Sequence, residues 1–279
     1  MIEQYSSSML TSILDLCAVE AADRPEGSKL LQAPVTESVR NVLAALDARW
    51  GWFPAEGMHR PAGIDELSWQ TGLLRFAATT AERLESSGIS PAIIEATLGD
   101  VGNQFALHRR MHGTFGMATD WWSTLHLSGS LFRIGRLQFH LHRNHDAGPW
   151  VLGLHIPQDG PLDAVSVDQS CAEAAAFFAR HFGDRVIDHA YCDSWLLDPY
   201  LSAHRPSSNI ASFAARFGEV QLRDEPGDAL YFTFRAQPNV DISTLPRDTS
   251  LQSLVLERIE SGGVWQCGKG TALWPMAVG

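Results

Sequence analysis

The sequence has no excess of basic charge, no long apolar run and no paired-cysteine motif. Its formal net charge is −11 over 279 residues and neither half carries a basic face, so nucleic acid is not an expected partner. No run approaches the roughly twenty apolar residues that span a bilayer, and the first residues lack the pattern of a secretory signal. The four cysteines (Cys17, Cys171, Cys192 and Cys267) lack C-x-x-C spacing. These absences predict a reduced, cytoplasmic protein with no membrane partner.

Helical periodicity dominates residues 1–118. Apolar residues recur every three or four positions in four segments, which predicts helices near residues 9–17, 39–50, 64–87 and 91–111. Ser90-Pro91 is typical of an N-cap followed by proline in the first turn. The last helix is expected to be interrupted near Gly99 and Gly102, and the stretches between the first three helices are expected to be loops. Residues 1–118 are thus predicted to form a helical domain.

The pattern changes in residues 119–279, where short strands alternate with helices. Strands are predicted at residues 131–142, 150–157, 186–197, 220–222, 230–234 and 264–274, and helices at 121–127, 167–182, 208–217 and 251–259. The long strand at residues 131–142 should be half-buried, because apolar and polar residues alternate along it. The fold class is therefore α+β, with a helical domain (1–118) before a mixed-sheet domain (119–279).

Residues 150–199 organise the second domain. An apolar strand, a helix with one apolar face and a second apolar strand follow each other with connections that suit a crossover between parallel strands. Gly183 is expected to end the helix in a left-handed conformation. Ligands of open sheets bind near the carboxyl ends of such strands, where this chain carries His155 on the first strand and Cys192, Asp193 and Ser194 on the second.

Four blocks carry a resemblance to a known family. They are residues 131–139 (LFRIGRLQF), 155–162 (HIPQDGPL), 192–199 (CDSWLLDP) and 208–210 (SNI). In this order they resemble the bacterial GNAT-like acyltransferases, which carry a helical N-terminal domain before a GNAT-like C-terminal domain. The resemblance implies an acyl-CoA co-substrate whose pantetheine arm lies between two splayed parallel strands, here residues 150–156 and 186–195.

The resemblance also implies cofactor contacts, which this chain keeps in part. Backbone groups near Leu154 and Ile156 would polarise the thioester, and Asn209, beside Ser208, would contact pantetheine. GNAT enzymes cradle the pyrophosphate with a glycine-rich loop before a helix. The corresponding loop, residues 158–167, has one glycine, Gly160, and two acidic residues.

His155 is the candidate general base. An amine must shed a proton as it attacks a thioester, and imidazole titrates near neutral pH without any shift. Many GNAT enzymes place a glutamate on this strand, and many use a tyrosine on the helix after the second strand as an acid; residues 208–217 contain none. The alternative is that His155 only fixes the end of its strand.

The second strand offers several candidate side chains on its two faces. Cys192 and Ser194 share one face, and Tyr191 and Asp193 share the other. Cys192 could carry the acyl group if His155 activated it, although it could equally be a core cysteine. Asp193 could accept the substrate ammonium, and Ser194 or Tyr191 could lie near the leaving sulfur.

Other polar residues allow both a functional and a structural interpretation. Arg136 and Gln138 are predicted to project from one strand face, where they could orient substrate or only face solvent. His140, His142 and His145 have a spacing that could bind zinc, with Asp146 as a further ligand, but the resemblance implies no metal and none is expected. Ser208 and Asn209 most simply cap a helix.

The sequence thus predicts an acyl-CoA-dependent N-acyltransferase that acts on a small amine by direct attack on the thioester. The alternative is a GNAT-like binding module that has lost catalysis, which the atypical loop favours; a metal-dependent hydrolase is a minor third interpretation. The acceptor site is expected between the two domains. The helical domain could be a lid, a scaffold or the surface of a homodimer.

Overall fold

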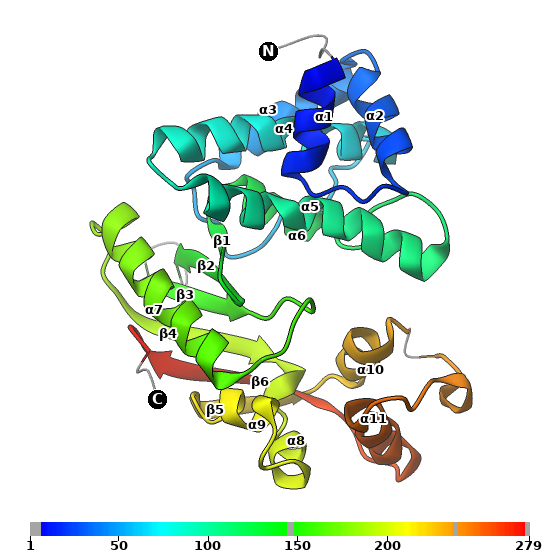
Figure 1. The fold of residues 1–279 in the computed structure, drawn as a ribbon, viewed down its shortest axis with the longest axis vertical. Helices are drawn as coiled ribbons and strands as arrows, with labels where there is room; N and C mark the ends of the chain where they lie inside the picture. The colour runs from blue at the N-terminus through cyan, green and yellow to red at the C-terminus, as the bar shows by residue number, and fades with distance from the viewer. Residues whose placement is uncertain (1–6, 144–147, 237–238, 277–279) are drawn as a thin grey trace.

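The computed structural model describes residues 7–143, 148–236 and 239–276. Helices gather at one end of the molecule and a sheet forms the other (Figure 1). The helical half comprises α1 (Ser7–Leu16), α2 (Arg24–Gln32), α3 (Glu37–Arg49), α4 (Glu66–Ser86), α5 (Pro91–His112) and α6 (Asp120–Leu127). Within the described residues, no helix combines the length and the apolarity that crossing a membrane requires.

The glycines of α5 serve close packing rather than interruption. The prediction of a break near Gly99 and Gly102 is wrong, because α5 runs unbroken from Pro91 to His112. A Cβ on Gly102 would lie 2.1 Å from the carbonyl oxygen of Cys17, so glycine allows α5 to approach the end of α1. The prediction of proline in the first turn after Ser90 is confirmed.

The stretch after α1 contains a helix that the sequence did not predict. Pro25 lies in the first turn of α2, where its missing N–H costs no intrahelical hydrogen bond. Two residues of this helix, Leu30 and Leu31, are buried. A proline near the start of a segment is therefore compatible with a helix, and the expected loop was wrong.

The second half is built on a six-stranded mixed sheet in the order β1-β2-β3-β4-β6-β5. All neighbours are antiparallel except β3 and β4, the pair predicted to be parallel. The strands are β1 (Leu131–Ile134), β2 (Leu137–Arg143), β3 (Trp150–His155), β4 (Ile187–Ser194), β5 (Gly218–Asp224) and β6 (Gln266–Leu273). The helices are α7 (Ala164–His181), α8 (Pro199–His204), α9 (Asn209–Ala214), α10 (Pro226–Phe234) and α11 (Ser250–Glu260), with 3-10 turns at Trp195–Leu197 and Ile242–Thr244.

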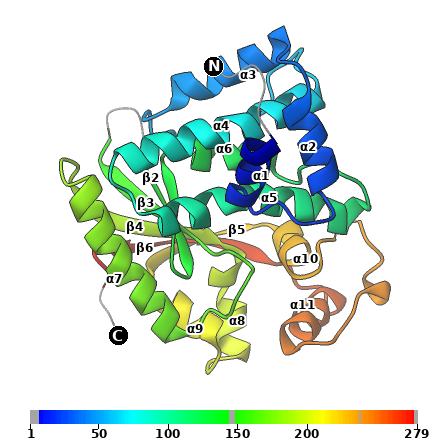
Figure 2. The same ribbon diagram turned by 45° about the horizontal axis from the view of Figure 1, so that its top comes forward.

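The sheet has one apolar face and one polar face. Helix α7, which connects β3 to β4, covers the apolar face (Figure 2), where Phe139 and Leu154 join Phe178 in the main core. The opposite face carries Gln138, His140 and His142 on β2, next to His155 and Tyr191. The alternation of apolar and polar residues predicted for β2 is confirmed, but the expected half-burial is wrong, because both faces of residues 137–142 are buried.

Three local predictions in this half were wrong. Residues 131–142 form a hairpin rather than one strand, because Gly135 adopts a φ of 58° and turns the chain. Residues 230–234 lie in α10, which starts at Pro226 and buries Leu230. Helix α7 ends at His181, and Gly183 is not left-handed.

A segment inserted between β5 and β6 forms a small unit of its own. Helices α10 and α11 pack on a second apolar cluster that includes Trp195, Leu254 and Trp265. Figure 1 shows both helices beside the open end of the sheet, across from α5. This segment therefore supplies a third wall near the ends of β3 and β4.

Candidate active site

The two central parallel strands part before they end. β3 and β4 pair from Trp150 and Ile187 only as far as Gly153 and Tyr191. Beyond this point, Leu154 and His155 pair with β2, and residues 192–194 pair with β6. The predicted splay is thus confirmed. Backbone groups of residues 154–156 that face β4 have no partner there, so they are available to a ligand.

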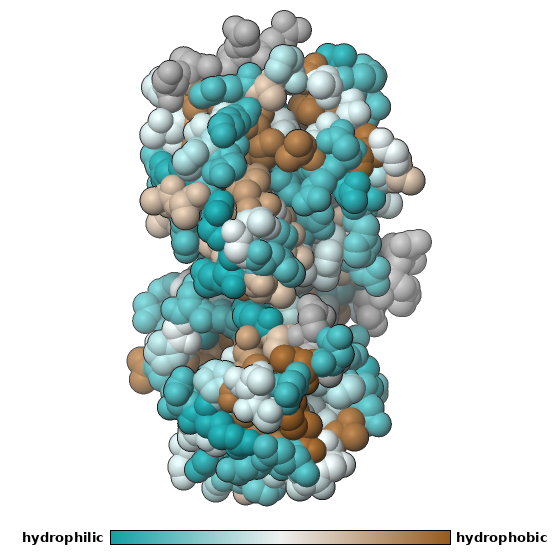
Figure 3. Space-filling model, turned by 90° about the vertical axis from the view of Figure 1, so that its right-hand side faces the viewer, coloured by the Kyte–Doolittle hydropathy of each residue, from teal (hydrophilic) through white to brown (hydrophobic). Residues whose placement is uncertain are grey.

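A cavity of about 860 Å³ lies at this opening. Its walls come from the helical half (Asp100, Trp122), from the parted strands (residues 154–156 and 192–195) and from the inserted segment (Tyr231, Phe232). Figure 3 faces the side on which the helical half meets the inserted segment, and the molecule narrows there. The predicted position of the site between the two halves agrees with this cavity, and such junctions are common ligand sites.

His155 lies on the cavity wall at the end of β3. Its ring packs edge-on against Trp122, with centroids 4.7 Å apart, and its Nε2 atom is buried without a hydrogen-bond partner. Burial lowers the pKa of His155 to about 3, and the nearby His126 and His142 act in the same direction. The expectation of an ordinary imidazole pKa is therefore wrong. At neutral pH the ring is uncharged, so Nε2 can accept a proton.

Tyr191 and His155 converge above Gly153. A Cβ on Gly153 would lie 3.0 Å from the Tyr191 hydroxyl and 3.2 Å from His155 Nε2, so an alanine would push these side chains aside by a few tenths of an ångström. The Tyr191 hydroxyl donates to His142 Nε2 at 2.8 Å, because His142 Nδ1 donates to the Arg143 carbonyl. Burial raises the pKa of Tyr191 to about 12, so the hydroxyl keeps its proton. Tyr191 thus lies behind His155 rather than among the cavity-lining residues.

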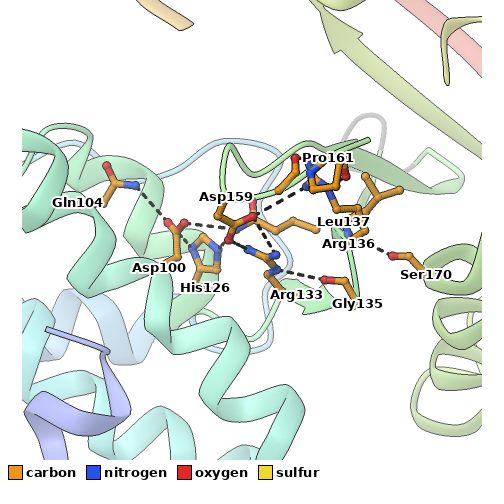
Figure 4. A network of polar contacts seen from close by, with 12 residues as sticks. Asp100, Gln104, His126, Arg133, Gly135, Arg136, Leu137, Asp159, Pro161 and Ser170 are labelled. Carbon is orange, nitrogen blue, oxygen red and sulfur yellow. Dashed lines mark hydrogen bonds and ion pairs between the residues drawn. The ribbon is translucent and has the colours of Figure 1, made fainter. Parts of the chain in front are cut away.

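Gln138 links the sheet to the helical half. Its side-chain amide lies 3.2 Å from His126 Nε2 and 3.4 Å from a carboxylate oxygen of Asp100. Figure 4 shows His126 beside Asp100. Gln138 is also the β2 residue directly opposite His155. The predicted Gln138 is thus placed at the cavity beside the candidate base.

Arg136 holds the loop after β3. It lies in the turn between β1 and β2, so the expectation that it shares a strand face with Gln138 is wrong. Its guanidinium donates to the carbonyls of Gly160 at 2.8 Å and Pro161 at 2.7 Å (Figure 4). Arg136 nonetheless lines the cavity, as Gly160 does.

The two acidic residues of this loop already have partners. Asp159 forms a bidentate ion pair with Arg133 (Figure 4). Asp163 caps α7 by accepting from the Ser166 backbone at 3.0 Å and from its hydroxyl at 2.7 Å. Because a carboxylate caps the N-terminus of α7, this helix end differs from the usual phosphate cradle.

The structure places Cys192 and His155 on opposite faces of the sheet, although both line the cavity. The Cys192 thiol faces the apolar side of the sheet, where burial raises its pKa, so nothing there favours a thiolate. Asp193 pairs with Arg223 at 2.6 Å, which compensates its charge. Ser194 accepts from the Leu196 backbone at 3.1 Å and keeps its own hydrogen for a ligand in the cavity. Ser194 extends from the same strand face as Cys192, and its role near the leaving sulfur stays a prediction.

The predicted cofactor residues lie together on the cavity wall. Leu154, Ile156, Gly160, Ser208 and Asn209 all line it. The Ser208 hydroxyl accepts from the Ala211 backbone at 3.1 Å, so its role as an N-cap is confirmed. Contact of these residues with a cofactor stays a prediction.

The histidines of β2 make structural contacts. His140 Nε2 donates to the Pro54 carbonyl at 2.8 Å, which ties the loop before α4 to the sheet. In the described part of the chain, no group of three or more histidine, cysteine or acidic side chains could hold a metal ion. His145 and Asp146 lie outside the described residues.

Sequence reasoning missed the contributions of the helical half to the site. Asp100 and Trp122 line the cavity from α5 and α6. One sequence signal could have indicated Asp100. This acidic residue lies between Leu98 and Val101, which belong to the apolar face of the predicted helix. The parted parallel strands around a cavity, with a helical half above them, define a GNAT-like class of fold.

Comparison with known proteins agrees with this class. The family described as GNAT-like C-terminal domain matches residues 131–272, and the family described as N-acyltransferase N-terminal domain matches residues 15–129. The chain therefore belongs to the N-acyltransferases that combine these two domains. A comparison with curated proteins found no match.

Solved structures of acyltransferases resemble the whole chain. A mutant acyltransferase in complex with octanoyl-CoA is 27% identical, with a TM-score of 0.85 over 98% of this chain and 90% of that chain. An acyltransferase in complex with decanoyl-CoA and teicoplanin is 28% identical, with a TM-score of 0.85 over 97% of this chain and 89% of that chain. The likeness thus covers both halves and the junction between them.

Proposed function

We propose that this protein transfers an acyl group from an acyl-CoA thioester to an amine acceptor. The main support is the opening between β3 and β4. The two strands no longer pair beyond Gly153 and Tyr191, and the residues that follow on each strand line the cavity. Solved relatives in complex with octanoyl-CoA and decanoyl-CoA support a donor of this type. The unpartnered backbone of residues 154–156 suits a pantetheine arm, and its N–H groups suit a developing oxyanion.

His155 takes the proton of the attacking amine in this mechanism. An ammonium acceptor first releases one proton to solvent, and its nitrogen then forms a bond to the thioester carbonyl carbon. A second N–H proton passes to His155 Nε2, which is buried and has no other partner. The C–S bond then breaks, and the imidazolium returns this proton to the thiolate, with the Ser194 hydroxyl as a further donor. The low basicity of His155 makes the return favourable.

The acceptor is proposed to be a primary amine that enters between the helical half and the sheet. Both halves line the cavity, and Asp100 lies on its wall without a lysine or arginine partner among the described residues, which suits a cationic acceptor. One solved relative is in complex with CoA and 10C-teicoplanin. Acceptors of that kind therefore belong in the same assay as small amines.

His155→Gln provides the direct test. The variant should still be stabilised against heat by octanoyl-CoA, whereas amine-dependent release of CoA thiol should fall by roughly 10²–10⁴-fold. Ser207→Ala, an exposed change outside the cavity lining, is the control and should match the wild type. A His155→Gln enzyme with the full rate would remove His155 from the mechanism.

The alternative function is a GNAT-like module that binds a ligand without catalysis. Asp163 favours it, since its carboxylate caps α7 where a phosphate would otherwise lie. Thermal shift with acetyl-, octanoyl- and decanoyl-CoA separates the two functions. A thioester that stabilises the protein and releases thiol when an amine is added supports the transferase. A thioester that stabilises the protein but releases no thiol with any amine supports the binding module. If no thioester changes the Tm, the protein does not bind CoA and both functions are contradicted.

A further inference from the structure

Asp100 is a carboxylate of the cavity wall without a cationic partner. Its side chain is 13% exposed, and its only ion-pair contact among the described residues is His126, at 3.8 Å. Burial lowers the pKa of His126, so this imidazole is neutral at pH 7. Two neutral amides also contact it, Gln104 at 3.1 Å (Figure 4) and Gln138 at 3.4 Å. A largely desolvated carboxylate is costly unless a cation joins it.

Three other acidic residues near the cavity already have an arginine or thiol partner. Asp193 has Arg223 at 2.6 Å, and Asp159 has Arg133. Asp228, on α10, accepts from the Cys267 thiol at 3.0 Å. Asp100 alone contacts Gln138, the residue opposite His155 in the sheet. A cation bound to Asp100 would therefore lie close to the candidate base.

We propose that Asp100, from the helical half, binds the ammonium form of the acceptor amine and holds it beside His155. This inference rests on the proposed acyl transfer and specifies that the acceptor binds as a cation. It also gives the helical half a direct part in substrate recognition. Asp193, the residue that the sequence suggested for this task, is occupied by Arg223.

A matched pair of acceptors tests the proposal with octanoyl-CoA as donor. Phenethylamine is cationic at pH 7.5, whereas O-benzylhydroxylamine has almost the same shape and is neutral. In Asp100→Asn, the KM for phenethylamine should rise about tenfold or more, because a hydrogen bond to a charged group is lost. The KM values for O-benzylhydroxylamine and for octanoyl-CoA should stay within about twofold of the wild type. Glu95→Gln, on an exposed position of the same helix, should change none of them.

Thermal stability distinguishes binding from a structural role. If Asp100 serves the acceptor, the Tm of Asp100→Asn should equal or exceed that of the wild type, because an uncompensated charge leaves the interior. A lower Tm of Asp100→Asn, with equal rises in the KM values for both acceptors, would overturn the inference in favour of a structural role. An unchanged KM for phenethylamine would overturn it outright. If the wild-type protein acylates none of the three acceptors (phenethylamine, O-benzylhydroxylamine and teicoplanin), the proposed transferase function itself is contradicted. The role of Asp100 is then not what has failed.

Discussion

Gly153 is the residue on which the shape of the base site depends. Tyr191 and His155 both lie where a Cβ at this position would be. Gly153→Ala should therefore displace His155 and lower kcat about tenfold or more, with a loss of roughly 1–3 kcal/mol in the free energy of unfolding from overpacking. Steady-state kinetics and urea denaturation measure the two effects.

Gly218→Ala is the control for this change. It lies on β5 outside the cavity lining, and a Cβ there would meet nothing within 4 Å. Its kcat should stay close to that of the wild type. Equal kinetics for both alanine variants would show that crowding at Gly153 does not matter.

The low basicity of His155 should appear in the pH dependence of the reaction. The base works unprotonated, and burial lowers its pKa to about 3. With O-benzylhydroxylamine, which stays largely neutral down to about pH 5.5, kcat/KM for octanoyl-CoA should remain flat from pH 8 to about pH 5.5. A decline with a midpoint near 6.5 would instead indicate an imidazole that keeps its ordinary pKa.

At the scale of helices and strands, the sequence predicted what periodicity and caps determine. The strand pair β3 and β4, helix α7 and the N-cap Ser208 follow from local patterns and are confirmed. The missed or misassigned elements depend on tertiary contacts. Helix α10 was read as a strand because its apolar residues are consecutive, and only packing on the inserted segment selects the helix.

Asp198 joins three elements of the second half. Its carboxylate, 1% exposed, caps α8 by accepting from Tyr200, and it also accepts from Arg258 at 2.7 Å and from the Gln266 backbone at 2.9 Å. Asp198→Ala should cost about 3–5 kcal/mol in the free energy of unfolding, because Arg258 and two N–H groups would lose their partner. Chemical denaturation measures the loss, and a cost below about 1 kcal/mol would contradict it.

At the scale of the whole molecule, the site could be predicted only in part. His155 and Ser194 became candidates because strand ends in a parallel pair are recognisable in a sequence, and Gln138 because polar and apolar residues alternate along β2; all three line the cavity. Asp100 and Trp122 were missed because they come from α5 and α6, and no local pattern shows which residues of a helix will face another domain. The pKa of His155 likewise depends on burial by Trp122 and by the histidines around it.

The histidines on the polar face of the sheet should make the whole fold sensitive to acid. Burial lowers the pKa values of His126, His140, His142 and His155 in the folded protein, whereas unfolded histidines titrate near 6.5. The unfolded chain therefore binds more protons below pH 6.5, so the free energy of unfolding should fall as the pH falls.

The contribution of one such histidine can be measured with His140→Gln. An amide can still donate to the Pro54 carbonyl, which His140 contacts at 2.8 Å, but it does not titrate. Between pH 7.5 and pH 5.5, the variant should lose about 1 kcal/mol less stability than the wild type in urea denaturation. His189→Gln, at an exposed position of β4, should keep the wild-type slope. If His140→Gln kept that slope too, His140 would not contribute to the acid sensitivity.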